Sequence, residues 1–358
     1  MNILITGGFG NVGRSAVSAC LAAGHKVAIF ESPSALKRAQ AGLRRLLKTQ
    51  WRQCAFVFGD IRSPEDVGRA FAAFEGGPDA VIHLAALIPP ASDRNPAVTE
   101  AINVGGTASV IAAAKACPKP PRVVLASSIA IYGDRLADFW IRTMDEVHVS
   151  DTYSGTKVAC EGLLRASGLD FAILRLSFVA WAKWLPLDPL LFSVPPETRL
   201  EIIHTEDAGR AFAAAAALPA ASGRTFDIGG GALCRTSFRA YIDRMFRYFG
   251  LGSSAFLPAS AFARGGFHCG WYEDSDEAER LLSFRRKTLE DYYEEVRWET
   301  RFIRPLAALA APAVRHWLLK MSPFSPRAPQ SRAPSSRSPR RAGGSSPARL
   351  RPSTQERR

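Results

Sequence analysis

The sequence has few of the features that mark membrane, secreted or metal-binding proteins. No apolar run reaches the ~18 residues that span a bilayer, and the most hydrophobic stretch, residues 171–196, is interrupted by Arg175, Lys183 and Asp188. The six cysteines include no C-x-x-C pair, so neither a zinc site nor a disulfide framework is expected. Residues 1–6 are strand-like and no charged or apolar leader precedes them, which predicts a cytoplasmic protein.

Acidic residues are scarce in one segment, and the net charge of +13 is concentrated there. Residues 322–358 hold nine Arg and one Glu and carry +8, which leaves +5 for residues 1–321. The same segment is rich in Ser and Pro and poor in large apolar residues, a composition that predicts a disordered tail. Such a tail is either a solvated extension or a contact region for anionic surfaces; recognition of a specific nucleic acid is not expected.

Short apolar runs alternate with segments of helical length in the first half of the chain. The runs are residues 2–6, 26–30, 55–58, 80–83, 123–126 and 171–174, and the helical segments include 10–23, 64–74, 95–116 and 152–167. Strands without polar alternation, separated by helices, predict an α/β fold with a doubly wound parallel sheet of the Rossmann type. Beyond residue 178 the rhythm changes, with a strand predicted at 201–203, a helix at 205–218 and a strand at 225–228.

A glycine-rich motif lies between the first predicted strand and the first predicted helix. Residues 6–13 contain G-x-G-x-x-G and, overlapping it, G-x-x-G-x-x-G. Glycines here let a pyrophosphate approach the backbone and the N–H groups of the helix N-terminus, which predicts a dinucleotide site. Glu31 follows the second strand and can accept hydrogen bonds from an adenine ribose while repelling a 2′-phosphate, which favours NAD over NADP. Lys37 and Arg38 keep NADP as the alternative.

A second motif, Y-x-x-x-K at Tyr153 and Lys157, places a phenol and an ammonium one helical turn apart on one face. A nearby ammonium stabilises a phenolate, so the pair predicts a tyrosine that exchanges protons with a substrate. Ser128 follows the fifth predicted strand, at the sheet edge where α/β proteins place their sites. These three residues form the predicted catalytic set.

With these motifs in this order, the chain resembles the extended short-chain dehydrogenase/reductase superfamily and, within it, the NAD-dependent epimerase/dehydratase family. The resemblance covers residues 2 to about 230 and rests on residues 6–13, 59–61, 83–86, 103–107, 127–128, 153, 157 and 204–207. It implies an NAD-dependent oxidoreductase or epimerase that transfers a hydride to or from a secondary alcohol or ketone, such as a nucleotide-sugar.

The resemblance also implies which residues hold NAD. Asp60 and Ile61 would contact adenine, Ala85 and Ala86 would line the cofactor cleft, and Asn103 would support the site from its helix. The full predicted cofactor set is Gly7, Gly10, Asn11, Val12, Gly13, Glu31, Asp60, Ile61, Leu84, Ala85, Ala86, Asn103, Tyr153 and Lys157. No metal is expected.

For catalysis, the resemblance implies that Tyr153 is the acid/base, that Ser128 hydrogen-bonds the reacting oxygen, and that Lys157 binds the nicotinamide ribose. Two departures from the family bear on the substrate. An Ile-Ala dipeptide follows Ser128 where dehydratases carry Asp-Glu, so 4,6-dehydration is disfavoured. Phe178 stands where sugar-nucleotide epimerases usually place an Asn against the nucleotide phosphate.

Two alternatives therefore stay open beside a nucleotide-sugar enzyme. One is a dehydrogenase of a lipophilic or steroid-like alcohol, for which an apolar pocket wall could come from Leu185, Leu187, Leu190, Leu191, Phe192 and Val194. The other is a non-catalytic NAD-binding regulatory protein.

The predicted organisation has four parts. Residues 1–178 form the NAD-binding core, completed by 201–230, and residues 179–200 with 231–300 form a small substrate-binding lobe. Residues 301–321 form an amphipathic helical segment broken by prolines, and the disordered basic tail follows. We expect a homodimer. For the region 302–358 two interpretations stay open: packing against the body or a dimer contact, and contact with an anionic membrane surface.

Overall fold

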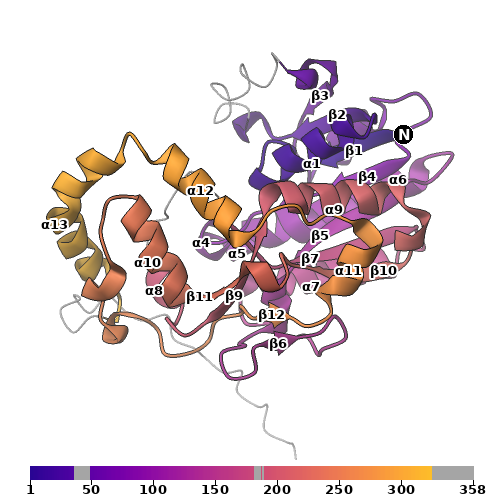
Figure 1. Ribbon diagram of the computed structural model, residues 1–358. Helices are drawn as coiled ribbons and strands as arrows, with labels where there is room; N and C mark the ends of the chain where they lie inside the picture. Colours follow the sequence, from indigo (N-terminus) through magenta and orange to yellow (C-terminus); the bar gives the residue numbers. More distant parts are fainter. Residues whose placement is uncertain (36–48, 181–186, 188, 325–358) are drawn as a thin grey trace, which may run out of the picture.

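The structure is a computed structural model and describes residues 1–35, 49–180, 187 and 189–324. Its central element is a seven-stranded sheet in the order β10-β7-β5-β4-β1-β2-β3, in which all neighbours are parallel (Figure 1). The strands are β1 (Asn2–Thr6), β2 (Lys26–Glu31), β3 (Ala55–Phe58), β4 (Ala80–His83), β5 (Arg122–Ser128), β7 (Phe171–Leu176) and β10 (Arg224–Ile228). The strand order reverses between β1 and β4, so the predicted doubly wound Rossmann fold is confirmed.

Helices cover both faces of this sheet, and six of its strands contribute to two apolar layers, whereas β10 contributes Phe226 and Ile228 to one. The helices are α1 (Asn11–Ala22), α3 (Pro64–Phe71), α6 (Gly106–Ala116), α7 (Thr152–Arg165) and α9 (Thr205–Ala217). On β1, Ile3 and Ile5 join the core beneath α1 and α9, whereas Leu4 joins the core beneath α3, α6 and α7. Because both faces are dry, the strands are apolar without alternation, as the sequence indicated.

The predicted helix at 95–116 is built from three consecutive pieces. These are α5 (Pro96–Glu100), a π-helical stretch η2 (Ala101–Gly105) and α6. Within the described residues this run, Pro96–Ala116, is the one helix long and apolar enough to cross a membrane. It packs against α3 and α7 over the sheet, which is the environment of a core helix.

The predicted strand at 201–203 lies outside the seven-stranded sheet. As β9 (Arg199–His204) it pairs with β8 (Phe178–Ala180) in parallel and with β11 (Arg235–Ser237) in antiparallel orientation. From the segment predicted to complete the core, β10 joins the large sheet and α9 packs on it, and Ile203 of β9 and Ala221 belong to the same hydrophobic core. A further two-stranded sheet joins β6 (Trp140–Ile141) to β12 (Trp271–Tyr272).

A second hydrophobic core lies beside the sheet, and we call the part built around it the smaller lobe (Figure 1). It contains β8, β9 and the helices α8 (Leu190–Ser193), α10 (Phe238–Tyr248), α12 (Leu289–Glu299) and α13 (Arg304–Met321). The remaining helices are α4 (Ala91–Arg94), α11 (Ser275–Leu282), η1 (Gln50–Gln53), η3 (Ile129–Tyr132), η4 (Pro219–Ala221), η5 (Ala232–Cys234), η6 (Ser254–Phe256) and η7 (Ala259–Ala261). The predicted domain limits and the substrate-binding role of this lobe stay predictions.

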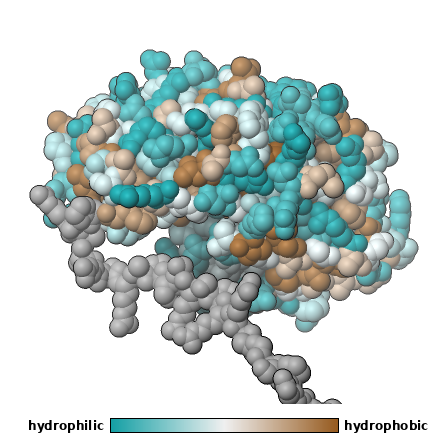
Figure 2. Space-filling view, turned by 90° about the horizontal axis from the view of Figure 1, so that it is seen from below, coloured by the Kyte–Doolittle hydropathy of each residue, from teal (hydrophilic) through white to brown (hydrophobic). Residues whose placement is uncertain are grey.

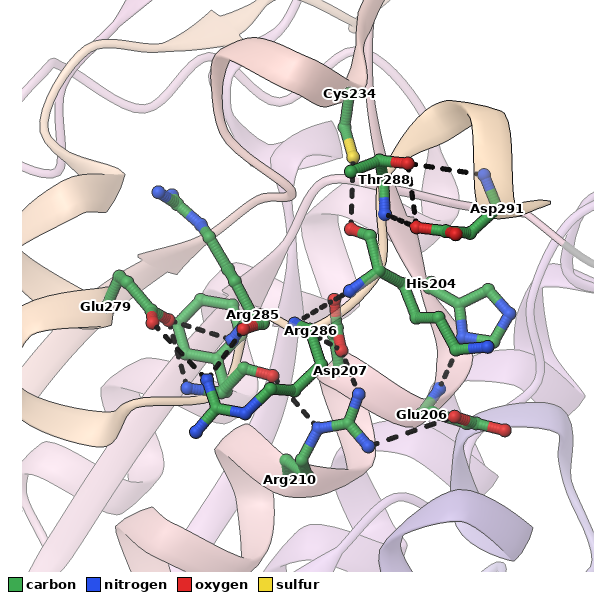
Figure 3. Close-up of polar contacts among 12 residues, drawn as sticks. His204, Glu206, Asp207, Arg210, Cys234, Glu279, Arg285, Arg286, Thr288 and Asp291 are labelled. Atoms are coloured by element: carbon green, nitrogen blue, oxygen red, sulfur yellow. Dashed lines mark hydrogen bonds and ion pairs between the residues drawn. The ribbon is translucent and has the colours of Figure 1, made fainter. Parts of the chain in front are cut away.

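Residues 283–288, between α11 and α12, join the smaller lobe to α9 by hydrogen bonds (Figure 3). The buried Asp207 carboxylate accepts the backbone N–H groups of Arg286 and Lys287, each at 3.1 Å, and also binds the Arg210 side chain. The N-cap of α9 is His204, whose Nδ1 accepts the Glu206 N–H at 3.2 Å.

The C-terminal described residues are more ordered than their composition predicts. Helix α13 runs without interruption through Pro312, so it is not broken there. Ser322, the first residue of the predicted disordered tail, is buried and donates its hydroxyl to Ala261 O at 2.5 Å. The rest of that tail, 325–358, lies outside the described residues, as do Lys37, Arg38 and Leu185.

Candidate active site

A cavity of about 970 Å³ opens where β1, β2, β3 and β4 end. Eight members of the predicted cofactor set line it: Gly7, Gly10, Glu31, Asp60, Ile61, Leu84, Ala85 and Ala86. The other six, Asn11, Val12, Gly13, Asn103, Tyr153 and Lys157, lie in the surrounding helices and are not part of its wall. The cavity therefore occupies the position at which doubly wound sheets bind nucleotides.

Two glycines of the motif are required by the local backbone. Gly7 has φ +75°, and a Cβ there would lie 2.9 Å from Ala85 N. A Cβ on Gly13 would lie 2.2 Å from Gly7 O, so only glycine lets α1 pack this closely on the loop. The N-cap of α1, Gly10, supplies no side-chain acceptor, so the first turn of α1 has no side-chain cap.

Glu31 ends β2 at the rim of the cavity. Its carboxylate accepts the N–H of Phe9, in the glycine-rich loop, at 3.1 Å and the N–H of Ser32 at 2.9 Å. A carboxylate has further lone pairs, so these bonds leave acceptor capacity toward the cavity. The residue is thus fixed in position and remains an acceptor for a ribose hydroxyl.

Asp60 carries its charge beside a cation on the same cavity wall. Arg62 binds its carboxylate at 2.5 Å, and this hydrogen bond holds the pKa of Asp60 below its ordinary value. The backbone N–H of Asp60 donates to Asp66 at 2.7 Å, which fixes the turn that follows β3.

Asn103 ties the cavity wall to the helix that carries the Y-x-x-x-K motif. Its Oδ1 accepts the N–H of Leu87 at 2.8 Å, and its Nδ2 donates to Leu87 O and to Thr156 Oγ1, each at 3.0 Å. The side chain is buried and does not line the cavity. Its predicted supporting position is therefore explained by a clamp between the loop after β4 and α7.

The predicted catalytic residues gather at the carboxyl end of β5. Ser128 is the last residue of this strand, and its Oγ accepts the Ala130 N–H at 3.2 Å. On α7, the buried Lys157 donates from Nζ to Ala126 O on β5 at 2.8 Å and lies 5.6 Å from the ring centre of Tyr153. One ammonium thus faces both the phenol and the strand that ends at the serine.

His83 ends β4 behind the cavity wall and is fully buried. Its Nδ1 lies 2.7 Å from Thr6 Oγ1 and its Nε2 lies 3.1 Å from Thr107 Oγ1, so two threonine side chains satisfy the ring. Burial, with a smaller contribution from the charge of Lys157, lowers the pKa of His83 to about 3. The ring is neutral and serves the packing of the sheet.

A buried network of polar side chains lies near the carboxyl ends of β5 and β7. Arg175 on β7 forms two hydrogen bonds with Glu161, at 2.8 and 3.0 Å, and donates to Tyr132 Oη at 2.7 Å. The Tyr132 hydroxyl in turn donates to Asp227 at 2.9 Å, and burial raises the pKa of this carboxyl well above its ordinary value. The sequence analysis singled out none of these as a group, since they come from four separate elements.

Sequence reasoning also missed several residues of the cavity wall. Arg14 contributes a cation, with Nε donating to Phe9 O at 3.0 Å, and Phe9, Leu87 and Ile102 contribute apolar surface. The available signal for Arg14 was its place directly after the last glycine of the motif. Among the described residues, no group of three or more His, Cys, Asp or Glu side chains is arranged to hold a metal.

Comparison with known sequences identifies the same region. Residues 3–180, about half of the chain, match the NAD dependent epimerase/dehydratase family. The chain is similar to a CDP-paratose 2-epimerase of Salmonella typhi (33% identical over 135 residues, 37% of this chain and 38% of that protein). It is also similar to a UDP-glucose 4-epimerase of Neisseria meningitidis serogroup A (36% over 143 residues, 37% and 38%). The matches span less than half the length of these curated relatives.

Solved structures resemble a larger part of the chain. A UDP-glucose 4-epimerase from Stenotrophomonas maltophila, with bound NAD and formylated UDP-arabinopyranose, has a TM-score of 0.67 and 22% identity, covering 86% of this chain and 99% of that one. A short-chain dehydrogenase/reductase superfamily protein from Agrobacterium tumefaciens, with bound NAD, has a TM-score of 0.64 and 22% identity, covering 87% and 99%. These likenesses show the fold. The family match establishes that, through residues 3–180, the chain belongs to the NAD-dependent epimerase/dehydratase family.

Proposed function

We propose that the chain transfers a hydride between NAD and a secondary alcohol or ketone, as a dehydrogenase or as an epimerase. The observation that carries the proposal is the buried Lys157 ammonium, which faces the Tyr153 ring and is hydrogen-bonded to the strand that ends at Ser128. Burying an ammonium group costs free energy unless hydrogen bonds or an opposite charge compensate for its lost hydration. The Lys157 ammonium lies where it would stabilise a phenolate at Tyr153.

The residues present fit a dinucleotide. Cβ atoms at Gly7 and Gly13 would collide with backbone, so this loop is built for close approach, and it is followed by a helix N-terminus without a side-chain cap. Gly7, Gly10 and Gly13 would admit the pyrophosphate, Glu31 would accept from the adenine ribose, and Lys157 would bind the nicotinamide ribose. When bound, the nicotinamide supplies the hydride acceptor or donor.

In the proposed reaction the side chains of the protein transfer the proton. The Tyr153 phenolate accepts the proton of the substrate alcohol as the hydride leaves, and in the reverse direction the Tyr153 hydroxyl returns that proton to the ketone oxygen, while the Ser128 hydroxyl donates a hydrogen bond to the same substrate oxygen. Lys157 stabilises the phenolate form of Tyr153 during that exchange. Asn103 keeps the loop after β4 in register with α7 and so acts as a positioning residue.

Replacing the Tyr153 hydroxyl tests this assignment. Tyr153→Phe is expected to lower turnover by about 10²–10⁴-fold, the range for loss of a general acid/base, while NAD affinity stays within about twofold. Tyr248→Phe, which removes a hydroxyl that binds Arg244 in the smaller lobe, is the control and keeps its activity. Equal turnover of the two variants would refute the role of Tyr153. NAD binding without turnover on any alcohol or nucleotide-sugar would favour the regulatory alternative.

The choice of NAD over NADP is a separate proposal. Its support is the Glu31 carboxylate, fixed at the cavity rim by two backbone N–H groups, which would repel a 2′-phosphate. We expect isothermal titration to show tighter binding of NAD than of NADP, and Glu31→Ala to narrow the difference. Arg14, on the same cavity, supplies the opposite charge, so Arg14→Ala should weaken NADP more than NAD. Equal affinities of the unmodified chain for both cofactors would contradict the proposal.

For the substrate we propose a nucleotide-sugar with epimerase or dehydrogenase chemistry, because three of the four similar proteins named above are nucleotide-sugar epimerases. The structure weakens the lipophilic alternative, since Leu191, Phe192 and Val194 are packed in the second core. Native mass spectrometry of the purified protein, read for retained cofactor and substrate, distinguishes the two. A homodimer and a cytoplasmic location belong to the same proposal.

A further inference from the structure

Helix α13 exposes a row of large apolar side chains. Leu306 is 70% exposed, Leu309 83% and Trp317 47%, and Phe302, just before the helix, is 75% exposed. At 3.6 residues per turn, the three helical positions fall within an arc of roughly 80°. The opposite side of the helix, with Ala311 and Leu318, is buried in the second core. We call the row Phe302, Leu306, Leu309, Trp317 the α13 stripe.

The stripe lies at the edge of the molecule, where its position favours an extended contact. In Figure 1, α13 forms the outer margin of the smaller lobe, on the side away from the seven-stranded sheet. On the face in Figure 2, apolar residues lie in separate patches among hydrophilic ones. Three members of the stripe are aligned along one helix, which is backed by packing in the second core.

The charges within and after the stripe in the sequence, as far as residue 355, are of one sign, whereas the exposed Glu299 lies just before it. Residues 301–355 contain no Asp or Glu, and the nine arginines after residue 324 follow the helix directly in sequence. Arg301, itself exposed, lies over the rings of Trp298 and Phe302, at 3.6 and 4.3 Å from their centres. Lys320 is exposed in the last turn of α13. Tryptophan and arginine side chains together are favoured at the boundary between lipid headgroups and acyl chains.

We propose that the α13 stripe docks on the surface of an anionic lipid bilayer. The stripe enters the headgroup region, and Arg301 and Lys320 beside it neutralise lipid charge. A second copy of the chain would bring the same cations together, which costs Coulomb energy. A nucleic acid would satisfy the arginines but offers no apolar phase to the leucines. Only an anionic lipid surface offers both an apolar phase for the leucines and negative charge for the cations.

The experiment measures co-sedimentation of the full chain with two kinds of vesicle, phosphatidylcholine alone and phosphatidylcholine with about one third phosphatidylserine. We expect binding only to the anionic vesicles. The double variant Leu306→Glu/Leu309→Glu should bind about tenfold more weakly, because each change opposes insertion and adds a repelled charge. Leu233→Glu is the matched control: Leu233 is a 75% exposed leucine on η5, so its replacement should leave vesicle binding unchanged.

Each other outcome overturns the proposal. Absence of binding to anionic vesicles, or equal binding of the double variant and the control, excludes the stripe as the lipid contact. A change in oligomeric state of the double variant without lipid, seen by analytical ultracentrifugation, assigns the stripe to a second copy. Binding to a single-stranded RNA homopolymer, with no binding to vesicles, assigns the arginines to nucleic acid. Both variants should keep the NAD affinity and thermal midpoint of the unmodified chain, since the altered side chains are exposed.

Discussion

The buried ring of His83 makes the stability of this protein depend on pH in a calculable way. In the folded state its pKa is about 3, against an ordinary value of 6.5. As the pH falls below 6.5, the unfolded chain takes up a proton at this residue while the folded chain does not. The stabilising contribution is therefore complete above pH 6.5 and is lost as the pH falls toward 3, by about 1.4 kcal/mol per pH unit.

Between about pH 7.5 and pH 5 the loss from this one group amounts to about 2 kcal/mol. The variant His83→Asn removes the titrating ring and keeps a polar group beside Thr6 and Thr107. It should be less stable than the unmodified chain at the higher pH, but the difference should shrink by about 2 kcal/mol at the lower one. Both proteins share every other titrating group, so the change in their difference isolates His83.

Urea-induced unfolding of both proteins at the two pH values gives the four free energies needed. Parallel dependence on pH, with a constant difference between the two proteins, would refute the reasoning. It would mean that water or a rearranged Thr107 lets the folded ring take up a proton near its ordinary pKa.

Two further predictions concern packing and buried charge. Gly13→Ala should abolish NAD binding or folding, because its Cβ would lie 2.2 Å from a backbone oxygen. Gly162→Ala in α7 has open space around it and should raise the free energy of unfolding by about 0.5–1 kcal/mol. Calorimetry measures the stability of both variants, and titration measures their affinity for NAD. Glu161→Gln leaves the buried Arg175 without its charge partner and should cost about 3–5 kcal/mol in urea unfolding, against at most about 1 kcal/mol for Glu273→Gln in the exposed pair with Arg142. Similar costs for the last two variants would contradict the expected effect of burial.

The strands of the large sheet could be placed from the sequence because dry strands are continuous apolar runs. Residues 2–6, 55–58 and 80–83 have the predicted limits. β5 and β7 extend two residues further, through Ser128 and Leu176, because backbone pairing between them continues past the point where polar side chains begin. The polar residues at the strand ends belong to the candidate site, so a search for apolar runs does not include them.

Other features depended on contacts that no local pattern shows. The strand at 199–204 is apolar enough for the large sheet, but its partners β8 and β11 come from segments with little periodicity. The glycine-rich loop, Glu31 and Tyr153/Lys157 were evident from spacing, whereas the role of Asn103 as a clamp depends on Leu87 and Thr156, which are 16 and 53 residues away. Contacts between residues this far apart in the sequence are determined by the arrangement of the sheet, and no pattern in the neighbouring sequence predicts them.

The Asn103 clamp has a consequence for how the substrate range of such a protein can change. The described hydrogen bonds that join α7 to β5 and, through Asn103, to the cavity loop come from residues 87–160, in the part of the chain that builds the seven-stranded sheet. The smaller lobe contributes none of these bonds. The proposed chemistry is therefore a self-contained module, and the smaller lobe can be exchanged or rebuilt for a different substrate while the proton-handling residues keep their positions.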